Sequence, residues 1–158
     1  MTHEKEERSL IIIKPDAVQR SLVGEVITRF ERKGLKIIGM KMMHINDALV
    51  EEHYAHIKDK DFFPRIRRFM TSTPVIVMAV SGLSVIDAIR IIVGPTRSFE
   101  AAGGTIRGDY ALSMQSNVVH ASDSKEAAEV EIKRFFKDEE LMNYEKIDTL
   151  IIHSDELM

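Results

Sequence analysis

The chain has 158 residues, of which 44% are hydrophobic and 30% are charged, a composition typical of a globular protein with one domain. Its 22 basic and 25 acidic residues give a net charge of −3, which provides no general attraction to nucleic acid or to an anionic membrane. The absence of cysteine excludes disulfides and thiolate metal sites.

One domain is expected for residues 1–158, with a core over about residues 8–145 and a short C-terminal tail. The segment MTHEKEERS (1–9) is charged and contains no apolar stretch of the kind that a signal peptide requires. The longest aliphatic runs are too short to span a bilayer. We therefore expect a cytoplasmic protein without a membrane partner.

The first part of the chain predicts a strand, a helix and a second strand. SLIIIK (9–14) is a continuous apolar run, typical of a strand buried on both faces, and Pro15 ends it. Residues 22–33 carry apolar side chains four positions apart, and Gly34 is a typical residue beyond a helix C-terminus. The apolar run LKIIGMKMMHI (35–45) predicts the second strand.

Two helices and a strand are expected next. Asn46 or Asp47 caps the first of these helices, which carries an apolar stripe along one face. Asp61 and Pro64 indicate the start of the second helix, because proline is favoured in the first turn. VIVMAV (75–80) is the clearest strand pattern in the chain.

The last part of the chain contains the longest stretch without periodicity. Ser84, with Asp87 three residues later, resembles a capping box that opens an aliphatic helix. PTRSFEAAGGTIRGDYA (95–111) follows, and a loop this long inside a compact domain is usually functional or disordered. A strand at 112–120 and a helix at 124–136 complete the predicted elements.

The resulting order, β-α-β-α-α-β-α-loop-β-α, reduces to β-α-β-β-α-β when the additional helices are set aside. That order is the ferredoxin-like arrangement, which is an α/β fold in the broad sense and an α+β fold in the narrow one. We therefore expect a four-stranded antiparallel sheet covered by helices.

His120 stands at a place where phosphate chemistry is favoured. Residues 117–124 read NVVHASDS and put this histidine at the end of a strand, just before a helix N-terminus. Ligands collect at strand ends in open α/β sheets, and helix N-termini attract phosphates. Glu131, in the third turn of that helix, could reach back and orient the imidazole. The alternative is a buried neutral histidine with a backbone partner, and position alone leaves both interpretations open.

Three cations also have a functional and a structural interpretation. Lys14, in KPD, is either an ammonium held rigidly at a strand end or a solvated lysine. Arg107, in GGTIRG (103–108), either binds an anion or belongs to a flexible turn. The chain has no GxxxxGK[ST] or GxGxxG pattern that would identify a phosphate-binding loop. Arg90 interrupts an aliphatic helix, and we expect it to matter only if it reaches the same pocket as the other two.

A metal pair is a weaker hypothesis. His53 and His56 lie three residues apart on a predicted helix, a spacing that can present two ligands on one face. There is no cysteine and no HExxH pattern to complete such a site. We therefore favour a structural interpretation of both histidines.

Several stretches together resemble nucleoside diphosphate kinases, in the same order and at the same spacing: KPDAVQRSLVGEVITRFERKG, EEHYAHIKDKDFF, GPTRS, GGTIRGDYA and NVVHASDSKEAAEVEI. The resemblance covers about residues 8–145. It implies ping-pong transfer of the γ-phosphoryl group from a nucleoside triphosphate to a nucleoside diphosphate, through a phosphohistidine at His120. It also implies a homo-oligomer, with a hexamer favoured over a tetramer.

The resemblance implies a role for each matching residue. His120 is the nucleophile, and Glu131 orients it with Ser122 between them. Lys14 and Tyr54 act beside the nucleophile at the γ-phosphate. The nucleotide-binding set is Lys14 at the ribose and γ-phosphate, Phe62 under the base, Arg90, Thr96 and Arg107 at the β- and γ-phosphates, and Asn117 at the ribose.

The implied cofactor is Mg²⁺, held by phosphate oxygens without a direct protein ligand, with Asp123 reaching it through water. The chain departs from the usual family pattern at Ala17 and Ala121, where glycine is common. If either position needs a positive φ, alanine costs roughly 1 kcal/mol there. Otherwise the extra methyl group is harmless.

Two other functions are weighed against an active kinase. One is a catalytically inactive, nucleotide-binding regulatory protein, which usually lacks at least one of Lys14, Arg90, Arg107, Asn117 and His120. The other is a single-stranded nucleic-acid binder, which would need aromatic residues on the strand faces and a basic surface. The predicted strands 9–14 and 75–80 contain no aromatic residue, so we expect no specific nucleic-acid partner.

Overall fold

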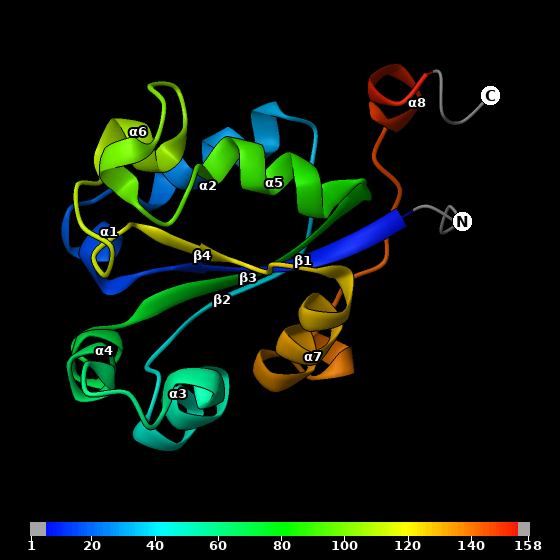
Figure 1. Cartoon of the computed structure of the whole chain (residues 1–158). Helices are drawn as coiled ribbons and strands as arrows, with labels where there is room; N and C mark the ends of the chain where they lie inside the picture. Colours follow the sequence, from blue (N-terminus) through cyan, green and yellow to red (C-terminus); the bar gives the residue numbers. More distant parts are fainter. Residues whose placement is uncertain (1–5, 155–158) are drawn as a thin grey trace.

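The computed structural model describes residues 6–154. Residues 1–5, which begin the charged N-terminal segment, and residues 155–158, which end the tail, lie outside the described residues. One antiparallel sheet has the strand order β2-β3-β1-β4 (Figure 1). The strands are β1 (Glu6–Ile13), β2 (Lys36–Met43), β3 (Val75–Leu83) and β4 (Val119–Ala121). The predicted four-stranded antiparallel sheet is confirmed.

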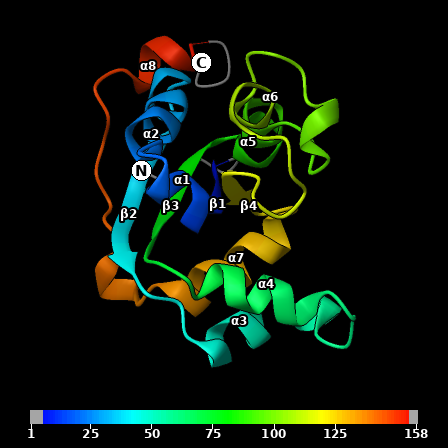
Figure 2. The ribbon, with the colours of Figure 1, turned by 90° about the vertical axis from the view of Figure 1, so that its left-hand side faces the viewer.

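Helices cover both faces of this sheet. Figures 1 and 2 show α2, α5 and α6 on one face and α3, α4 and α7 on the other. The helices are α1 (Pro15–Gln19), α2 (Val23–Arg32), α3 (Asp47–His53), α4 (Phe63–Met70), α5 (Val85–Val93), α6 (Ile106–Tyr110), α7 (Lys125–Phe135) and α8 (Thr149–Ile152), with 3₁₀ turns η1 (Ala55–Ile57), η2 (Ser98–Glu100) and η3 (Asp138–Glu140). Within residues 6–154, no helix has both the length and the apolarity needed to cross a membrane.

The continuous apolar pattern of β1 reflects burial on both faces of the sheet. Ile11 and Ile13 join an apolar cluster with α2 and α5, whereas Leu10 and Ile12 join a second cluster with α3, α4 and α7. All four side chains are fully buried. Successive residues of a strand point to opposite faces, so a strand covered on both sides needs an apolar residue at every position.

Of the two helix caps predicted, the one at Asn46 or Asp47 is confirmed at Asn46 and the one at Ser84 is wrong. The Asn46 side chain accepts a hydrogen bond from the Leu49 amide at 2.9 Å, and the Ser124 side chain accepts one from the Ala127 amide at 3.1 Å. Ser84 makes no side-chain cap and has a φ of 50°. A capping side chain needs an extended backbone at its residue. β3 ends at Leu83 and α5 begins at Val85, so the chain turns from strand to helix at Ser84 alone, in the left-handed region.

The strand predicted at residues 112–120 is wrong over most of its length. β4 covers only Val119–Ala121 and pairs with the last residues of β1. β1 ends there because Pro15 opens α1. Residues 112–118 therefore lie beyond the end of β1 and have no neighbouring strand with which to form a ladder.

The short helices that occur where the sequence predicts none include α1 and α6. α1 begins directly at Pro15, because proline lacks the N–H group that a first helical residue does not need. α6 lies inside the predicted loop 95–111, and the Thr105 side chain caps it by accepting from the Gly108 amide at 2.9 Å. Each helix has five residues, too few to produce a visible hydrophobic period.

Gly108 is the position at which α6 is most sensitive to substitution. A Cβ added there would overlap the backbone carbonyl of Ala102. We expect Gly108→Ala to lower the free energy of unfolding by about 1–3 kcal/mol, because the backbone must shift to make room. Gly103→Ala is the matched control, since nothing lies within 4 Å of its added Cβ. Equal thermal midpoints for the two variants would contradict the clash.

Candidate active site

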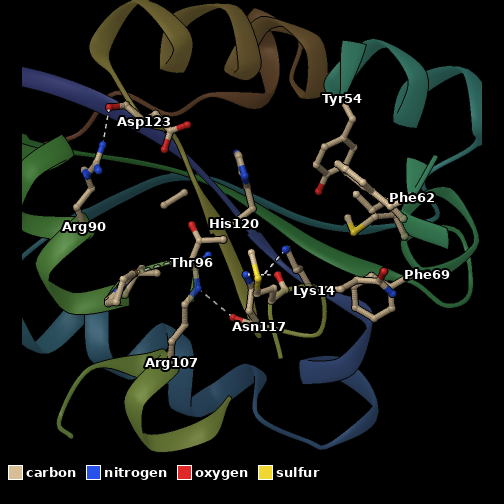
Figure 3. Close-up of a pocket in the computed structure, with 18 of the residues that line it drawn as sticks. Lys14, Tyr54, Phe62, Phe69, Arg90, Thr96, Arg107, Asn117, His120 and Asp123 are labelled. Carbon is tan, nitrogen blue, oxygen red and sulfur yellow. Dashed lines mark hydrogen bonds between the residues drawn. The ribbon is translucent and has the colours of Figure 1, made fainter. Parts of the chain in front are cut away.

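A pocket of about 730 Å³ opens between α4, α5, α6 and β4. Nine of the eleven site residues predicted from the sequence line it: Lys14, Tyr54, Phe62, Arg90, Thr96, Arg107, Asn117, His120 and Asp123 (Figure 3). The other two, Ser122 and Glu131, contact each other and stand next to His120. Arg90 shares the pocket with Lys14 and Arg107, so the condition for its functional interpretation is met.

His120 projects from β4, where it lies opposite Ile12 of β1. Its Nε2 is 3.2 Å from a carboxylate oxygen of Glu131. The same oxygen accepts a hydrogen bond from the Ser122 hydroxyl at 2.6 Å, and that hydroxyl accepts one from the Leu10 amide at 3.0 Å. A carboxylate accepts, so Nε2 carries the imidazole proton and Nδ1 keeps its lone pair.

Glu131 is ionised at neutral pH. Burial of its carboxyl group raises its pKa, but the hydrogen bond and charge of His120 and the hydroxyl of Ser122 outweigh burial and lower the pKa overall. The carboxylate is therefore an acceptor only, and it holds the imidazole in one orientation and one tautomer.

Lys14 is a buried ammonium at the floor of the pocket. It follows β1 directly, and its Nζ donates to Asn117 Oδ1 at 2.7 Å. The Asn117 amide in turn donates to the carbonyl of Met114 at 2.9 Å. Burial, with the nearby charge of Arg107, lowers the pKa of Lys14 to about 8. The group is thus charged at neutral pH but poised close to losing its proton.

Arg107 is held rigidly by backbone carbonyls. Its guanidinium donates to the carbonyls of Val119 at 2.7 Å, Gly94 at 3.1 Å and Asn117 at 3.3 Å. Burial lowers its pKa to about 10, which leaves it charged at neutral pH. No carboxylate neutralises it within hydrogen-bonding distance among residues 6–154, so its positive charge is directed at the pocket.

Arg90 and Thr96 lie at the exposed rim of the same pocket. Arg90 donates to the backbone carbonyl of Asp123 at 3.2 Å. Figure 3 shows the side chains of Arg90, Arg107 and Lys14 arranged around His120. Three cations around one imidazole form a site for a polyanion.

Val118 supplies a feature that the sequence gives no sign of. Its φ is +73°, which is rare for a β-branched residue and costs about 1–3 kcal/mol. Two hydrogen bonds hold it there: its amide donates to Asp16 Oδ2 at 3.0 Å, and its carbonyl accepts from the Lys14 amide at 2.9 Å. The turn places Asn117 against Lys14 while letting the chain enter β4 toward His120.

Aromatic side chains line the mouth of the pocket. Phe62 is 42% exposed, so its ring is available to a flat ligand. Burial raises the pKa of the Tyr54 hydroxyl to about 12, so it remains a hydrogen-bond donor at neutral pH. The pocket also contains residues that sequence analysis did not assign to it: Arg65, Ile66, Phe69, Met114 and Gln115.

The structure does not bring His53 and His56 together as a metal pair. His56 is exposed on η1, whereas His53 is buried against His120 with a ring-centroid distance of 4.7 Å. Among residues 6–154, the side chains near enough to share an ion are instead His53, His120 and Glu131. The sequence signal that could have placed His53 near the pocket is its position directly before Tyr54, which is a predicted site residue.

The two alanines at positions where the family commonly has glycine are unstrained. Ala17 is buried in α1 and Ala121 lies in β4. Neither has a positive φ; within residues 6–154 the non-glycine residues with positive φ are Ser21, Ser84 and Val118. The extra methyl groups therefore carry no backbone penalty.

Comparison with known proteins shows the family to which this chain belongs. The sequence model of nucleoside diphosphate kinase matches residues 7–141. The chain belongs to the nucleoside diphosphate kinase family. The enzyme of this name from Parabacteroides distasonis is 51% identical over 150 residues, covering 95% of this chain and 98% of the relative. That from Pyrococcus abyssi is 50% identical over 151 residues, covering 94% and 95%.

A solved structure agrees with the sequence matches. The nucleoside diphosphate kinase of Halobacterium salinarum, determined in complex with CDP, superposes with a TM-score of 0.91 at 42% identity. The match covers 93% of this chain and 98% of that one. The protein is therefore a phosphotransferase acting on nucleoside tri- and diphosphates, in a family that generally needs a divalent cation. A catalytically inactive regulatory protein is not favoured.

Proposed function

We propose that this nucleoside diphosphate kinase works by a ping-pong mechanism in which Nδ1 of His120 carries the phosphoryl group. The observation that supports the proposal is the pairing of His120 Nε2 with Glu131, which leaves Nδ1 as the nitrogen with a free lone pair. This nitrogen shares the pocket with three cations that suit a triphosphate: Lys14, Arg90 and Arg107.

The chemical step uses these groups in defined ways. Nδ1 attacks the γ-phosphorus, an N–P bond forms, and the bond to the β,γ-bridging oxygen breaks, releasing the nucleoside diphosphate. The imidazole becomes positively charged, and the Glu131 carboxylate stabilises that charge through Nε2–H. A second nucleoside diphosphate then attacks the phosphohistidine through a terminal β-phosphate oxygen and restores neutral His120.

A histidine suits such an intermediate better than the neighbouring Ser122 or Ser124. The donor and acceptor phosphoanhydrides are nearly equal in energy, so an intermediate shared between them must be high in energy as well. A phosphoserine ester would be a sink, whereas the P–N bond of phosphohistidine remains labile in both directions. The protein then has mainly to position the groups and stabilise charge.

The nucleotide is proposed to lie with its phosphates among the cations and Thr96. Its ribose lies at Lys14 and Asn117, and its base lies on Phe62. Base stacking tolerates any nucleoside, because every base has a π face. The Halobacterium salinarum relative, which was determined in complex with CDP, supports a nucleoside diphosphate as a ligand of this protein. Tyr54 is proposed to lie close to the transferred group.

The proposed divalent cation is Mg²⁺. Asp123 is the single carboxylate among the described residues that line the pocket, and one exposed carboxylate cannot form a cage of protein ligands. This donor set fits an ion held by phosphate oxygens, with Asp123 reaching it through water. When bound, the ion would neutralise phosphate charge. A homo-oligomer, with a hexamer favoured, remains a prediction from the family resemblance. A cytoplasmic location remains a prediction from the N-terminal segment and the short aliphatic runs.

Labelled nucleotide tests the proposed intermediate. The protein is incubated with γ-labelled ATP and Mg²⁺, quenched, and treated with acid or base. Protein-bound label that acid removes and base preserves is the expected phosphohistidine, and a GDP chase should move it to GTP. Transfer to GDP without any protein-bound label would contradict the ping-pong mechanism.

The pH dependence of catalysis should report the ammonium of Lys14. Its pKa of about 8 in the free enzyme predicts that kcat/KM falls about tenfold per pH unit above that value. Unfolding does not cause this fall. The pKa of Lys14 in the folded protein lies below its usual 10.5, so between these two values the unfolded chain binds more protons than the folded protein. The free energy of unfolding therefore rises with pH in that range. Lys14→Arg, which stays charged, should lose this limb of the profile; a limb unchanged in that variant would contradict the assignment.

A further inference from the structure

Arg134 is a charged residue of α7 that ends beside the active site without lining the pocket. Its side chain is 13% exposed. Its Nε donates to a carboxylate oxygen of Glu52 at 3.1 Å, and a terminal nitrogen of its guanidinium lies 3.1 Å from Nδ1 of His53. Figure 1 shows α3, which ends at His53, on the same face of the sheet as α7.

His53 is a neutral histidine. It is 8% exposed, and burial, followed by the nearby charge of His120, lowers its pKa to about 3. The other charged groups that act on it are Glu131, Arg134 and Lys14. Its ring packs edge to face against His120, with centroids 4.7 Å apart and planes at 78°.

The contact with Arg134 decides which nitrogen of His53 carries the proton. A guanidinium only donates hydrogen bonds, so Nδ1 of His53 must accept and the single ring proton resides on Nε2. A ring nitrogen of His53, a ring nitrogen of His120 and a carboxylate oxygen of Glu131 lie within 4.8 Å of one another. With the opposite tautomer, His53 would offer a lone pair that competes with Glu131 for the proton of His120.

We propose that Arg134 is a positioning residue, which holds His53 in its Nε2–H tautomer and thereby leaves Glu131 as the acceptor for the Nε2 proton of His120. The inference rests on the proposed role of His120 as the nucleophile.

A purely structural role would look different. Glu52, the other partner of Arg134, has a side chain that is 63% exposed, and ion pairs at such sites contribute little to stability. Loss of Arg134 should therefore leave the fold intact while releasing the tautomer of His53. The consequence is a slower phosphoryl transfer with unchanged affinity for nucleotide, because Arg134 does not line the pocket.

The test compares Arg134→Leu with Lys133→Leu, an exposed neighbour on the same helix, and with Arg134→Gln, which can still donate to His53. Long-range ¹H–¹⁵N spectra of wild-type protein should show His53 protonated at Nε2, and Arg134→Leu should populate the Nδ1–H form. Single-turnover phosphorylation by ATP should slow by about tenfold in Arg134→Leu, with the Kd for ADP unchanged. Arg134→Gln should recover much of the rate.

Several outcomes would overturn the proposal. A spectrum that shows wild-type His53 protonated at Nδ1 would contradict the proposal directly. An Arg134→Leu protein that keeps both the Nε2–H signal and the wild-type rate would contradict it as well. An equal loss of rate in Lys133→Leu would point to a general effect on α7. Failure of the proposed function is distinguishable, because wild-type protein would then acquire no label from ATP at all.

Discussion

Replacing His120 with alanine is expected to abolish phosphoryl transfer, with a fall of at least about 10⁴-fold in kcat, the scale seen when an enzyme loses its nucleophile. Among the described residues that line the pocket, no other side chain offers an imidazole nitrogen, and the amide nitrogens of Gln115 and Asn117 only donate hydrogen bonds. Steady-state transfer from ATP to GDP measures the loss, and label from γ-labelled ATP should no longer appear on the protein.

The control for this variant is His56→Ala. His56 is exposed on η1, so its loss should leave both the turnover and the label unchanged. The His120→Ala protein should still bind ADP, because the cations that hold the phosphates do not depend on the imidazole. Acid-labile label that persists in His120→Ala would place the intermediate on another residue.

Lys14→Met is expected to lower kcat/KM by about 10²–10³-fold, the usual effect of removing one preorganised group that stabilises developing charge. Methionine has nearly the length of lysine and fills the buried site, so the packing against Asn117 is kept. The charge is lost entirely, and Arg107 cannot move to replace it, since its guanidinium is held by three carbonyls. Steady-state kinetics over a range of ATP concentrations measures the change.

The stability of Lys14→Met should hardly change, and this separates function from folding. Removing a buried ammonium also removes its desolvation cost, which offsets the cost of leaving Asn117 Oδ1 without its hydrogen-bond donor. We expect the two effects to leave the free energy of unfolding of the variant within about 1 kcal/mol of the wild type. A large drop in the unfolding midpoint would instead attribute the loss of activity to a damaged fold.

The two buried cations, Lys14 and Arg107, explain how the pocket is suited to a polyanion. Burial lowers the pKa of each, which means that the free enzyme carries charges that are partly desolvated. A triphosphate supplies the missing opposite charge in a medium of low dielectric, where the attraction is larger than in water. The strained turn at Val118 also helps to hold Lys14 in place. The Val118 carbonyl accepts from the backbone amide of Lys14, and the Asn117 side chain accepts from its ammonium.

The sequence by itself determined much of the local structure. β1 is apolar at every position because both of its faces are covered, and the helix after Asn46 begins where a side chain can satisfy a free amide. The motifs around Lys14, Arg107 and His120 identified the family, because their order and spacing are specific. These signals are local: each depends on neighbours a few residues away, which the chain itself supplies.

Only the tertiary structure decided the rest. β4 is short because β1 ends at Pro15 and offers residues 112–118 no partner. Arg90 could equally have faced solvent, and only the packing of α5 beside β4 brings it to the pocket of His120. The contact of Arg134 with His53 joins residues 81 positions apart. Pairings of this kind depend on how separate elements meet in space, and no periodicity or capping pattern within a single segment records them.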